Sequence, residues 1–198
     1  MANEITREML QESVKVMLVG TGFLGEHVDK TLHKSYLGMV VVLTLEESVP
    51  GKCEILTPER IPEDLDVDTV WAWGFGNTFR EEEFQMMSMA DMMAGLGAPD
   101  GVGSPGLFVA TNARRAYGAS VILDITMLKK MAEIVGGDVF ILPSSIHEVL
   151  FLKADMTEAK NMARMVFSIN RAEVMAREVL SDHCLIFRAD TEKLEVAA

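Results

Sequence analysis

Three glycines near the start of the chain have the spacing of a phosphate-binding turn. Gly20, Gly22 and Gly25 form the pattern G-x-G-x-x-G directly after the apolar run 14–19. In dinucleotide-binding folds such glycines end a strand and open a helix, and an acid about 20 residues later binds the ribose. Glu46 follows at nearly that spacing. The pattern defines a first hypothesis, an NAD(P)-binding enzyme.

A second group of reactive side chains lies in the segment PSSIHE, residues 143–148. Ser144 and Ser145 stand close to His147, as a nucleophile and its general base would require. A turn explains the same residues, because proline fixes φ and serine hydroxyls bond nearby backbone amides. We favour the turn, since no oxyanion site is identifiable, and keep a serine hydrolase as an alternative hypothesis.

The segment 181–183, Ser-Asp-His, raises the same question, because an aspartate can orient a histidine. Serine and aspartate between a helix and a strand are more typical of caps and turns. His147 and His183 lack the short spacing of a metal site, and Cys53 and Cys184 are far apart. We therefore expect no catalytic residues, no metal and no cofactor.

Composition and charge argue against several functional classes for this chain. The chain has 198 residues, 49% of them hydrophobic, but no apolar run approaches the ~20 residues that span a bilayer. Its N-terminus lacks the basic and apolar regions of a secretory signal, so we expect a cytoplasmic protein without membrane contact. A net charge of −12 at pH 7 disfavours direct binding of nucleic acid. An acidic surface can instead occupy the basic channel of another protein, although solubility alone explains most acidic proteins.

In the first half, apolar periodicity predicts alternating strands and helices. The run Met39–Leu45 is continuous and β-branched, which is typical of a central strand buried on both faces. Methionines at helical spacing predict a helix over 84–96, which faces either the core or a partner. The other predicted elements are helices at 5–13, 24–34, 57–61 and 66–76, and strands at 14–19 and 53–56.

In the second half, strand-like runs follow one another through short turns. We predict that the strands 107–112 and 118–124 form a hairpin around residues 113–117. Helices are expected over 126–135, where Gly136 ends the helix, and from Thr157 onward. The remaining predicted strands are 138–143, 147–153, 184–188 and 193–196.

Short connections favour antiparallel pairing, so the predicted fold class is α+β, mainly an antiparallel sheet with packed helices, and not a doubly wound Rossmann fold. The Gly/Pro-rich run 97–106 is a predicted linker between an N-terminal α/β part, 1–96, and a C-terminal α+β part, 107–198. One composite domain is the alternative.

Several residues are candidates for contact with a partner. Two tryptophans two positions apart cannot share one helix face, so one of them is a candidate for exposure. The only local basic cluster is a pair of arginines in the predicted hairpin turn. The interaction candidates are Trp71, Trp73, Met87, Met92, Arg114 and Arg115.

The second half also resembles a known family. The segments that carry the resemblance are the Thr-Asn at 111–112, the Gly-Ala at 118–119, ILPSSIHEV at 141–149 and VLSD at 179–182. They are similar to the domain-of-unknown-function family numbered 5688, which occurs in gut Firmicutes, and a weaker similarity extends the match to about 14–188. Members of that family usually have an asparagine and polar residues where this chain has GTGFLG. The resemblance implies a strand-helix unit without a phosphate site, and it implies no reaction.

These observations favour a non-enzymatic bacterial protein that acts by contacting another protein. Its acidity suggests an accessory or inhibitor protein of a phage or mobile element. The alternatives are the NAD(P)-binding enzyme and the serine hydrolase. Oligomeric state and the identity of the partner are left open.

Overall fold

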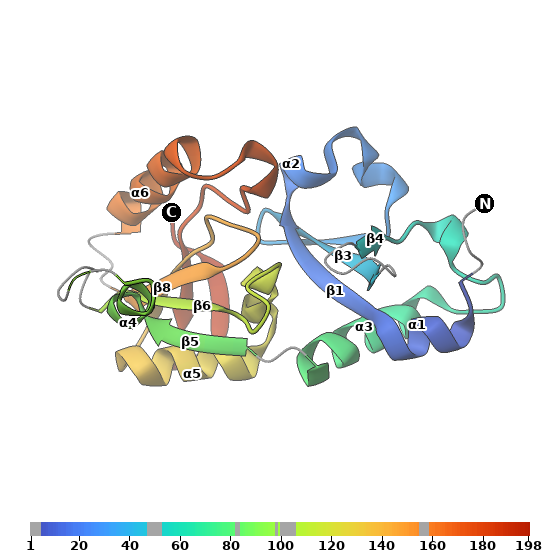
Figure 1. The fold of residues 1–198 in the computed structure, drawn as a ribbon, viewed down its shortest axis with the longest axis horizontal. Coiled ribbons are helices and arrows are strands. Elements are labelled where there is room, and N and C mark those ends of the chain that lie inside the picture. The colour runs from blue at the N-terminus through green and yellow to red at the C-terminus, as the bar shows by residue number, and fades with distance from the viewer. Residues whose placement is uncertain (1–4, 47–52, 82–83, 98, 100–105, 155–158) are drawn as a thin grey trace. The chain divides into compact units, whose positions relative to one another are not determined.

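The computed structural model describes residues 5–46, 53–81, 84–97, 99, 106–154 and 159–198. The chain divides into two compact units, Met1–Glu83 (unit 1) and Phe84–Ala198 (unit 2), which are drawn in Figure 1. Each unit contains an antiparallel sheet with helices, and the described strands form no Rossmann fold. The predicted α+β class is therefore confirmed.

The sheet of unit 1 is organised around one buried strand. β3 pairs antiparallel with each of the other three strands. Every residue from Met39 to Leu45 is buried, which confirms the predicted central strand. The strands are β1 (Val14–Gly20), β2 (His33–Tyr36), β3 (Met39–Glu46) and β4 (Cys53–Ile55).

The longest helix of unit 1 packs closely on this sheet. Gly74 lies in α3, and a Cβ atom there would come within 2.8 Å of Leu43 Cδ2 and 3.3 Å of Val16 Cγ1. A glycine thus lets the helix approach β1 and β3. The helices of this unit are α1 (Arg7–Ser13), α2 (Thr21–Leu24), η1 (Gly25–Lys30), η2 (Pro58–Arg60) and α3 (Val67–Glu81).

Two buried polar residues hold α3 against the junction of α1 and β1. Asn77 is 2% exposed, and its Nδ2 donates to the carbonyl oxygens of Gln11 at 3.1 Å and Val14 at 2.9 Å. The next residue, Thr78, accepts a 2.8 Å hydrogen bond from the backbone N–H of Val16. Because the last carbonyls of a helix lack partners inside it, Asn77 satisfies acceptors that the end of α1 leaves open.

The sheet of unit 2 has six strands in the order β10-β9-β7-β8-β6-β5, and every neighbouring pair is antiparallel. Strands β7 and β8, and β9 and β10, pair directly, as the short connections predicted, and β5 pairs with β6 across the longer connection that contains α4. The strands are β5 (Phe84–Ser88), β6 (Phe108–Asn112), β7 (Val139–Leu142), β8 (Val149–Lys153), β9 (Leu185–Arg188) and β10 (Lys193–Val196).

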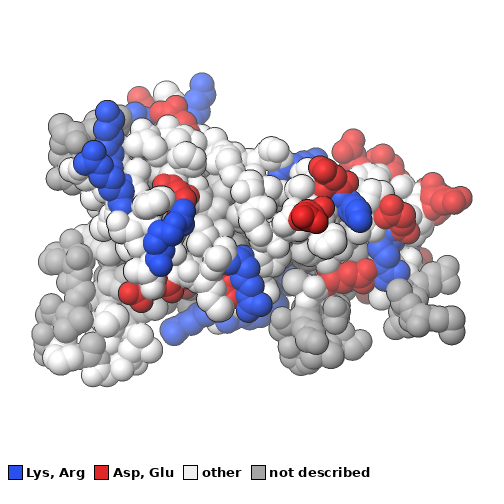
Figure 2. Space-filling view, turned by 90° about the horizontal axis from the view of Figure 1, so that it is seen from above, with Lys and Arg blue, Asp and Glu red and all other residues white. Residues whose placement is uncertain are grey.

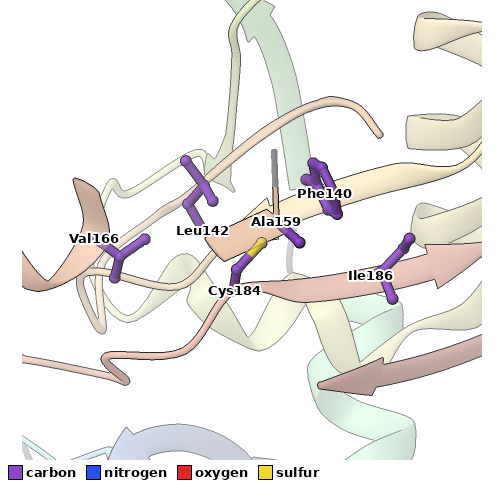
Figure 3. Close-up of a cluster of buried hydrophobic side chains, with 6 residues drawn as sticks. All are labelled: Phe140, Leu142, Ala159, Val166, Cys184 and Ile186. Atoms are coloured by element: carbon purple, nitrogen blue, oxygen red, sulfur yellow. The ribbon is translucent and has the colours of Figure 1, made fainter. Parts of the chain in front are cut away.

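Helices α5 (Ile125–Val135) and α6 (Ala159–Ala172) lie on opposite faces of this sheet (Figure 1). On the sheet face that α6 covers lies a cluster of buried apolar side chains, to which α6 contributes Ala159 and Val166 (Figure 3). Phe140, Leu142 and Ile186 supply its strand side chains. The shorter helices of the unit are α4 (Met89–Gly95), η3 (Gly118–Leu123) and η4 (Ala176–Glu178).

Three predicted elements are wrong. The helix expected at 24–34 is replaced by η1 and β2, because Gly25 adopts a positive φ of 53° and residues 33–36 pair with β3. The helix expected at 84–96 begins as strand β5 and becomes helical only at Met89, after the Ser88 hydroxyl accepts from Asp91 N–H. Pairing with β6 overrides the helical spacing of the methionines.

The third correction concerns the predicted hairpin around 113–117. β6 ends at Asn112, but residues 118–123 form the 3-10 helix η3 instead of a returning strand. The partner that β6 needs is supplied by β5 and β8. By contrast, α5 ends where Gly136 adopts φ 71°, which confirms the predicted helix and its cap. Thr157 and residues 98 and 100–105 of the predicted linker lie outside the described residues.

The two thiols have different environments, which predicts different reactivities. Cys184 is fully buried, and burial raises the pKa of its thiol to about 12, whereas Cys53 is half-buried. We expect a thiol reagent to modify Cys53 in the native chain and Cys184 only after unfolding. Counting thiols with and without urea, with Cys53→Ser as the control, measures this. Rapid native modification of Cys184 in that variant would contradict the burial.

The same thiol makes stability depend on pH in a defined direction. In the unfolded chain the thiol of Cys184 has a pKa of ~8.5. In the folded chain burial raises the pKa of this thiol to about 12. Above the unfolded pKa, the unfolded state therefore binds fewer protons than the folded state. The free energy of unfolding must fall as pH rises through this window, and Cys184→Ala should reduce that slope.

Candidate functional site

The three glycines follow a strand of an antiparallel sheet and not a strand of a Rossmann fold. β1 ends at Gly20, but the helix that follows, α2, has only four residues, and Gly25 turns the chain into η1. β1 and β3 are antiparallel, with Gly20 opposite Met39 and Val14 opposite Leu45. The backbone of Glu46 is thus at the other end of the sheet, roughly 20 Å from Gly20.

This topology predicts the result of a nucleotide titration. A Rossmann site requires the glycine turn and the acid at the same carboxyl edge of parallel strands, and β1 and β3 run in opposite directions. We expect calorimetry with NAD and with NADP to give no saturable heat up to about 1 mM nucleotide. Gly22→Asp serves as the control. Micromolar binding that Gly22→Asp abolishes would contradict this reading of the turn.

The segments that carry the family resemblance converge on His147 in unit 2. The carbonyl oxygen of His147 accepts the Thr111 hydroxyl at 2.8 Å and the Gly118 N–H at 3.0 Å. Ile146 N–H donates to the carbonyl of Glu178, and Leu180 N–H donates to the carbonyl of Ser144 at 3.2 Å, so the segment VLSD also joins from the chain after α6. A Cβ atom at Gly118 would lie 2.5 Å from Asn112 N and 2.7 Å from His147 O. Residues 111–118, 144–147 and 178–181 thus form one interlocked polar cluster, which we call the His147 cluster.

Both ring nitrogens of His147 face neighbouring groups. Nδ1 accepts the backbone N–H of Tyr117 at 3.3 Å, which places the ring proton on Nε2. Nε2 lies 3.7 Å from a carboxylate oxygen of Glu178, and the ring of Tyr117 packs against the imidazole at 5.4 Å between centroids. Tyr117 and Glu178 are not among the candidates that the sequence suggested, because both reach His147 from segments that are distant from it in the chain.

The two candidate serines serve the backbone in this cluster. The Ser145 hydroxyl accepts the N–H of His147 at 3.0 Å, and Ser144 contributes its backbone N–H and carbonyl to bonds with Leu142 and Leu180. Among the described contacts neither hydroxyl reaches the imidazole. A general base needs a free nitrogen near the nucleophile, and Nδ1 is already an acceptor. The geometry matches the turn interpretation better than a nucleophile and its base.

The segment 181–183 also forms a turn. The Ser181 hydroxyl accepts the N–H of His183 at 3.1 Å. Asp182 is held by Asn170 at 2.8 Å and Arg171 at 3.1 Å, not by the exposed His183. Among the described residues no group of three or more His, Cys, Asp or Glu side chains is arranged to hold a metal ion.

The predicted interaction candidates differ in exposure. Trp71 is 5% exposed and lies under Lys34, whose Nζ is 4.6 Å from the ring centroid, and Trp73 is half-buried. Arg114 and Arg115 are exposed in the turn after β6. Met87 and Met92, with the neighbouring methionines, are half-buried on β5 and α4. The candidates lie on α3 in unit 1 and on β5, α4 and the turn after β6 in unit 2.

Charge is distributed unevenly between the units. Unit 1 has 16 acidic and 7 basic residues, and unit 2 has 14 and 11. On the face shown in Figure 2 the carboxylates gather over unit 1. A set of exposed carboxylates on α1 and on the segment 59–68, which we call the acidic face, comprises Glu8, Glu12, Glu59, Glu63, Asp64, Asp66 and Asp68.

One ion pair connects the two parts of the acidic face. Arg7 on α1 bonds a carboxylate oxygen of Asp64 at 3.1 Å, so α1 and the segment 59–68 are neighbours. Glu59 accepts a hydrogen bond from Thr57, which lowers the pKa of its carboxyl and favours the charged form. The overall acidity was evident from the composition, but this site was not predicted, although the run PEDLDVD at 62–68 is a visible signal of it.

Comparisons with known proteins support the resemblance found in the sequence. A family model described as "Family of unknown function (DUF5688)" matches residues 4–189. No curated protein and no solved structure matches the chain. Within the described residues, no helix is both long and apolar enough to cross a bilayer.

Proposed function

Because the chain belongs to the DUF5688 family, whose function is unknown, we propose its function from its surfaces: it is a non-enzymatic protein that binds another protein through the acidic face of unit 1. The observation that carries the proposal is the concentration of exposed carboxylates on α1 and the segment 59–68. If charge served solubility alone, an even spread over both units would be sufficient.

The chemistry of the acidic face defines the partner. The acidic face has seven exposed carboxylates, and Arg7 neutralises one of them among the described contacts. Such a surface attracts a partner rich in lysine and arginine. Basic surfaces of this kind are typical of proteins that handle nucleic acids. We propose a cytoplasmic accessory or inhibitor protein, encoded by a phage or mobile element, that covers such a surface.

The second support is that neither candidate catalytic group is assembled among the described residues. The His147 cluster commits Nδ1 to a backbone donor, and the glycine turn lies on antiparallel strands. Both features fit structural roles. The alternatives of a serine hydrolase and an NAD(P)-binding enzyme therefore rank below protein contact.

The proposal is tested by affinity capture from the native host with two matched variants. Glu8→Gln, Glu12→Gln and Glu63→Gln together remove three charges from the acidic face. The control, Glu133→Gln, Glu173→Gln and Asp190→Asn, removes three exposed charges from unit 2. We expect the native chain and the control to retain a basic protein that the acidic-face variant loses. Equal capture by all three chains, or capture of no protein, would refute the proposal.

A further inference from the structure

The six-stranded sheet of unit 2 has two edge strands that differ in chemistry. β10 carries Lys193 and Glu195, both exposed, and Glu195 pairs with Arg188 at 3.3 Å. β5 has the sequence FQMMS and carries no charge. Proteins protect exposed edges with charged side chains, because an unprotected edge pairs readily with another strand. β10 carries such charged side chains and β5 carries none.

The uncharged surface continues from β5 onto α4. Five methionines of the two elements are half-buried, and α4 buries none of its described residues. The only charge in this stretch is Asp91, whose carboxylate is bonded by the Ser88 hydroxyl at 2.6 Å. Leu96, directly after α4, is 65% exposed. We call this surface, residues 84–96, the methionine edge.

We propose that the methionine edge binds a second copy of the chain by antiparallel pairing of β5 with β5. The argument for this occupant is the charge of the molecule. Two copies with a net charge of −12 each repel one another, and this repulsion is smallest when they meet through surfaces that are almost uncharged. The methionine edge meets that condition. A partner selected by opposite charge would bind the acidic face instead.

The geometry of β5 suits a two-fold contact. In an antiparallel pair centred on Met86, that residue lies opposite its own counterpart, and Gln85 lies opposite Met87. No like charges meet in this register, and flexible thioethers adapt to their neighbours. A pair of five-residue strands covers less than the ~800 Å² per partner of a stable dimer. The methionines of α4 must therefore add to the interface, and we expect a dissociation constant in the micromolar range.

The test is the mass of the full chain by sedimentation velocity and light scattering up to about 500 μM, which covers micromolar dissociation constants. The native chain should approach twice 21.8 kDa. Met86→Lys should raise the dissociation constant by roughly 100-fold, because it places two like charges opposite each other. Met175→Lys, at a methionine that is 55% exposed outside this surface, should leave it unchanged.

A charge-pair experiment separates a direct contact from a folding defect. Met86→Lys and Met86→Glu should each be monomeric, and an equimolar mixture should recover the dimer. If either variant loses its circular dichroism, Met92→Lys on α4 takes its place and should also weaken the dimer. A native chain that stays at 21.8 kDa at the highest concentration, or folded variants that dimerise as the native chain does, would overturn the proposal. Neither result depends on the acidic face.

Discussion

Gly118→Ala is expected to lower the free energy of unfolding by about 3 kcal/mol or more, at the upper end of what overpacking costs. The added Cβ would lie 2.5 Å from both Asn112 N and Thr111 Oγ1 and 2.7 Å from His147 O. Two of these three atoms belong to the backbone, so relief requires moving β6 or the 144–147 turn. Urea denaturation followed by circular dichroism measures the change.

Two glycines provide matched controls. Gly95 in α4 and Gly22 in α2 have open space at the position of a Cβ atom, and neither has a positive φ. Alanine at either position should change stability by less than about 1 kcal/mol and is favoured by its helix propensity. If Gly118→Ala is as stable as Gly95→Ala, the close packing of the His147 cluster is incorrect.

Asn77→Ala is expected to cost about 2–4 kcal/mol, because it leaves the buried carbonyl of Val14 and the partly buried carbonyl of Gln11 without their donor. The Nδ2 group bonds Gln11 O and Val14 O, and its removal opens the junction that α3 makes with α1 and β1. Asn77→Asp is the sharper variant. It keeps the shape but directs a carboxylate oxygen at two carbonyl oxygens. The bond that Oδ1 accepts from the exposed Arg80 at 2.7 Å offsets little of this repulsion, so the variant should cost at least as much as alanine.

An exposed residue of the same helix gives the control for Asn77. Ala72 lies on the solvent side of α3, and Ala72→Gln should leave the urea midpoint almost unchanged. The expected order of stability is native chain and Ala72→Gln, then Asn77→Ala, then Asn77→Asp. An Asn77→Asp chain as stable as the native one would show that the amide does not donate to those carbonyls.

Local sequence patterns correctly predicted the helices and strands whose conformation is not changed by pairing with a distant strand. Met39–Leu45 is continuously apolar and became the central strand, and α5 ends at Gly136, where a positive φ suits glycine. The methionine run 84–96 was mispredicted because its helical spacing is real but β6 recruits its first half as a strand. The residues 84–88 alone contain no pattern that predicts pairing with β6.

The candidate sites show the same limit. The spacing of Ser145 and His147 predicted that they lie close together, and the structure agrees. The contacts of the His147 ring, however, are made with Tyr117 and Glu178, which come from distant segments. The glycine pattern and Glu46 had the right spacing in sequence, and antiparallel pairing placed them at opposite ends of the sheet. In both sites the neighbours of each residue are set by the topology of the fold, which cannot be read from the spacing of residues in the sequence.

The most direct test of the proposed function is the salt dependence of binding between the chain and the protein that it captures. Contacts through exposed charges weaken as salt screens them. The account predicts that the dissociation constant of the native chain rises by about tenfold or more between roughly 50 and 500 mM salt, and that the Glu8→Gln, Glu12→Gln, Glu63→Gln variant shows a clearly smaller rise. A dissociation constant that is independent of salt, or an equal rise for the variant, would contradict it.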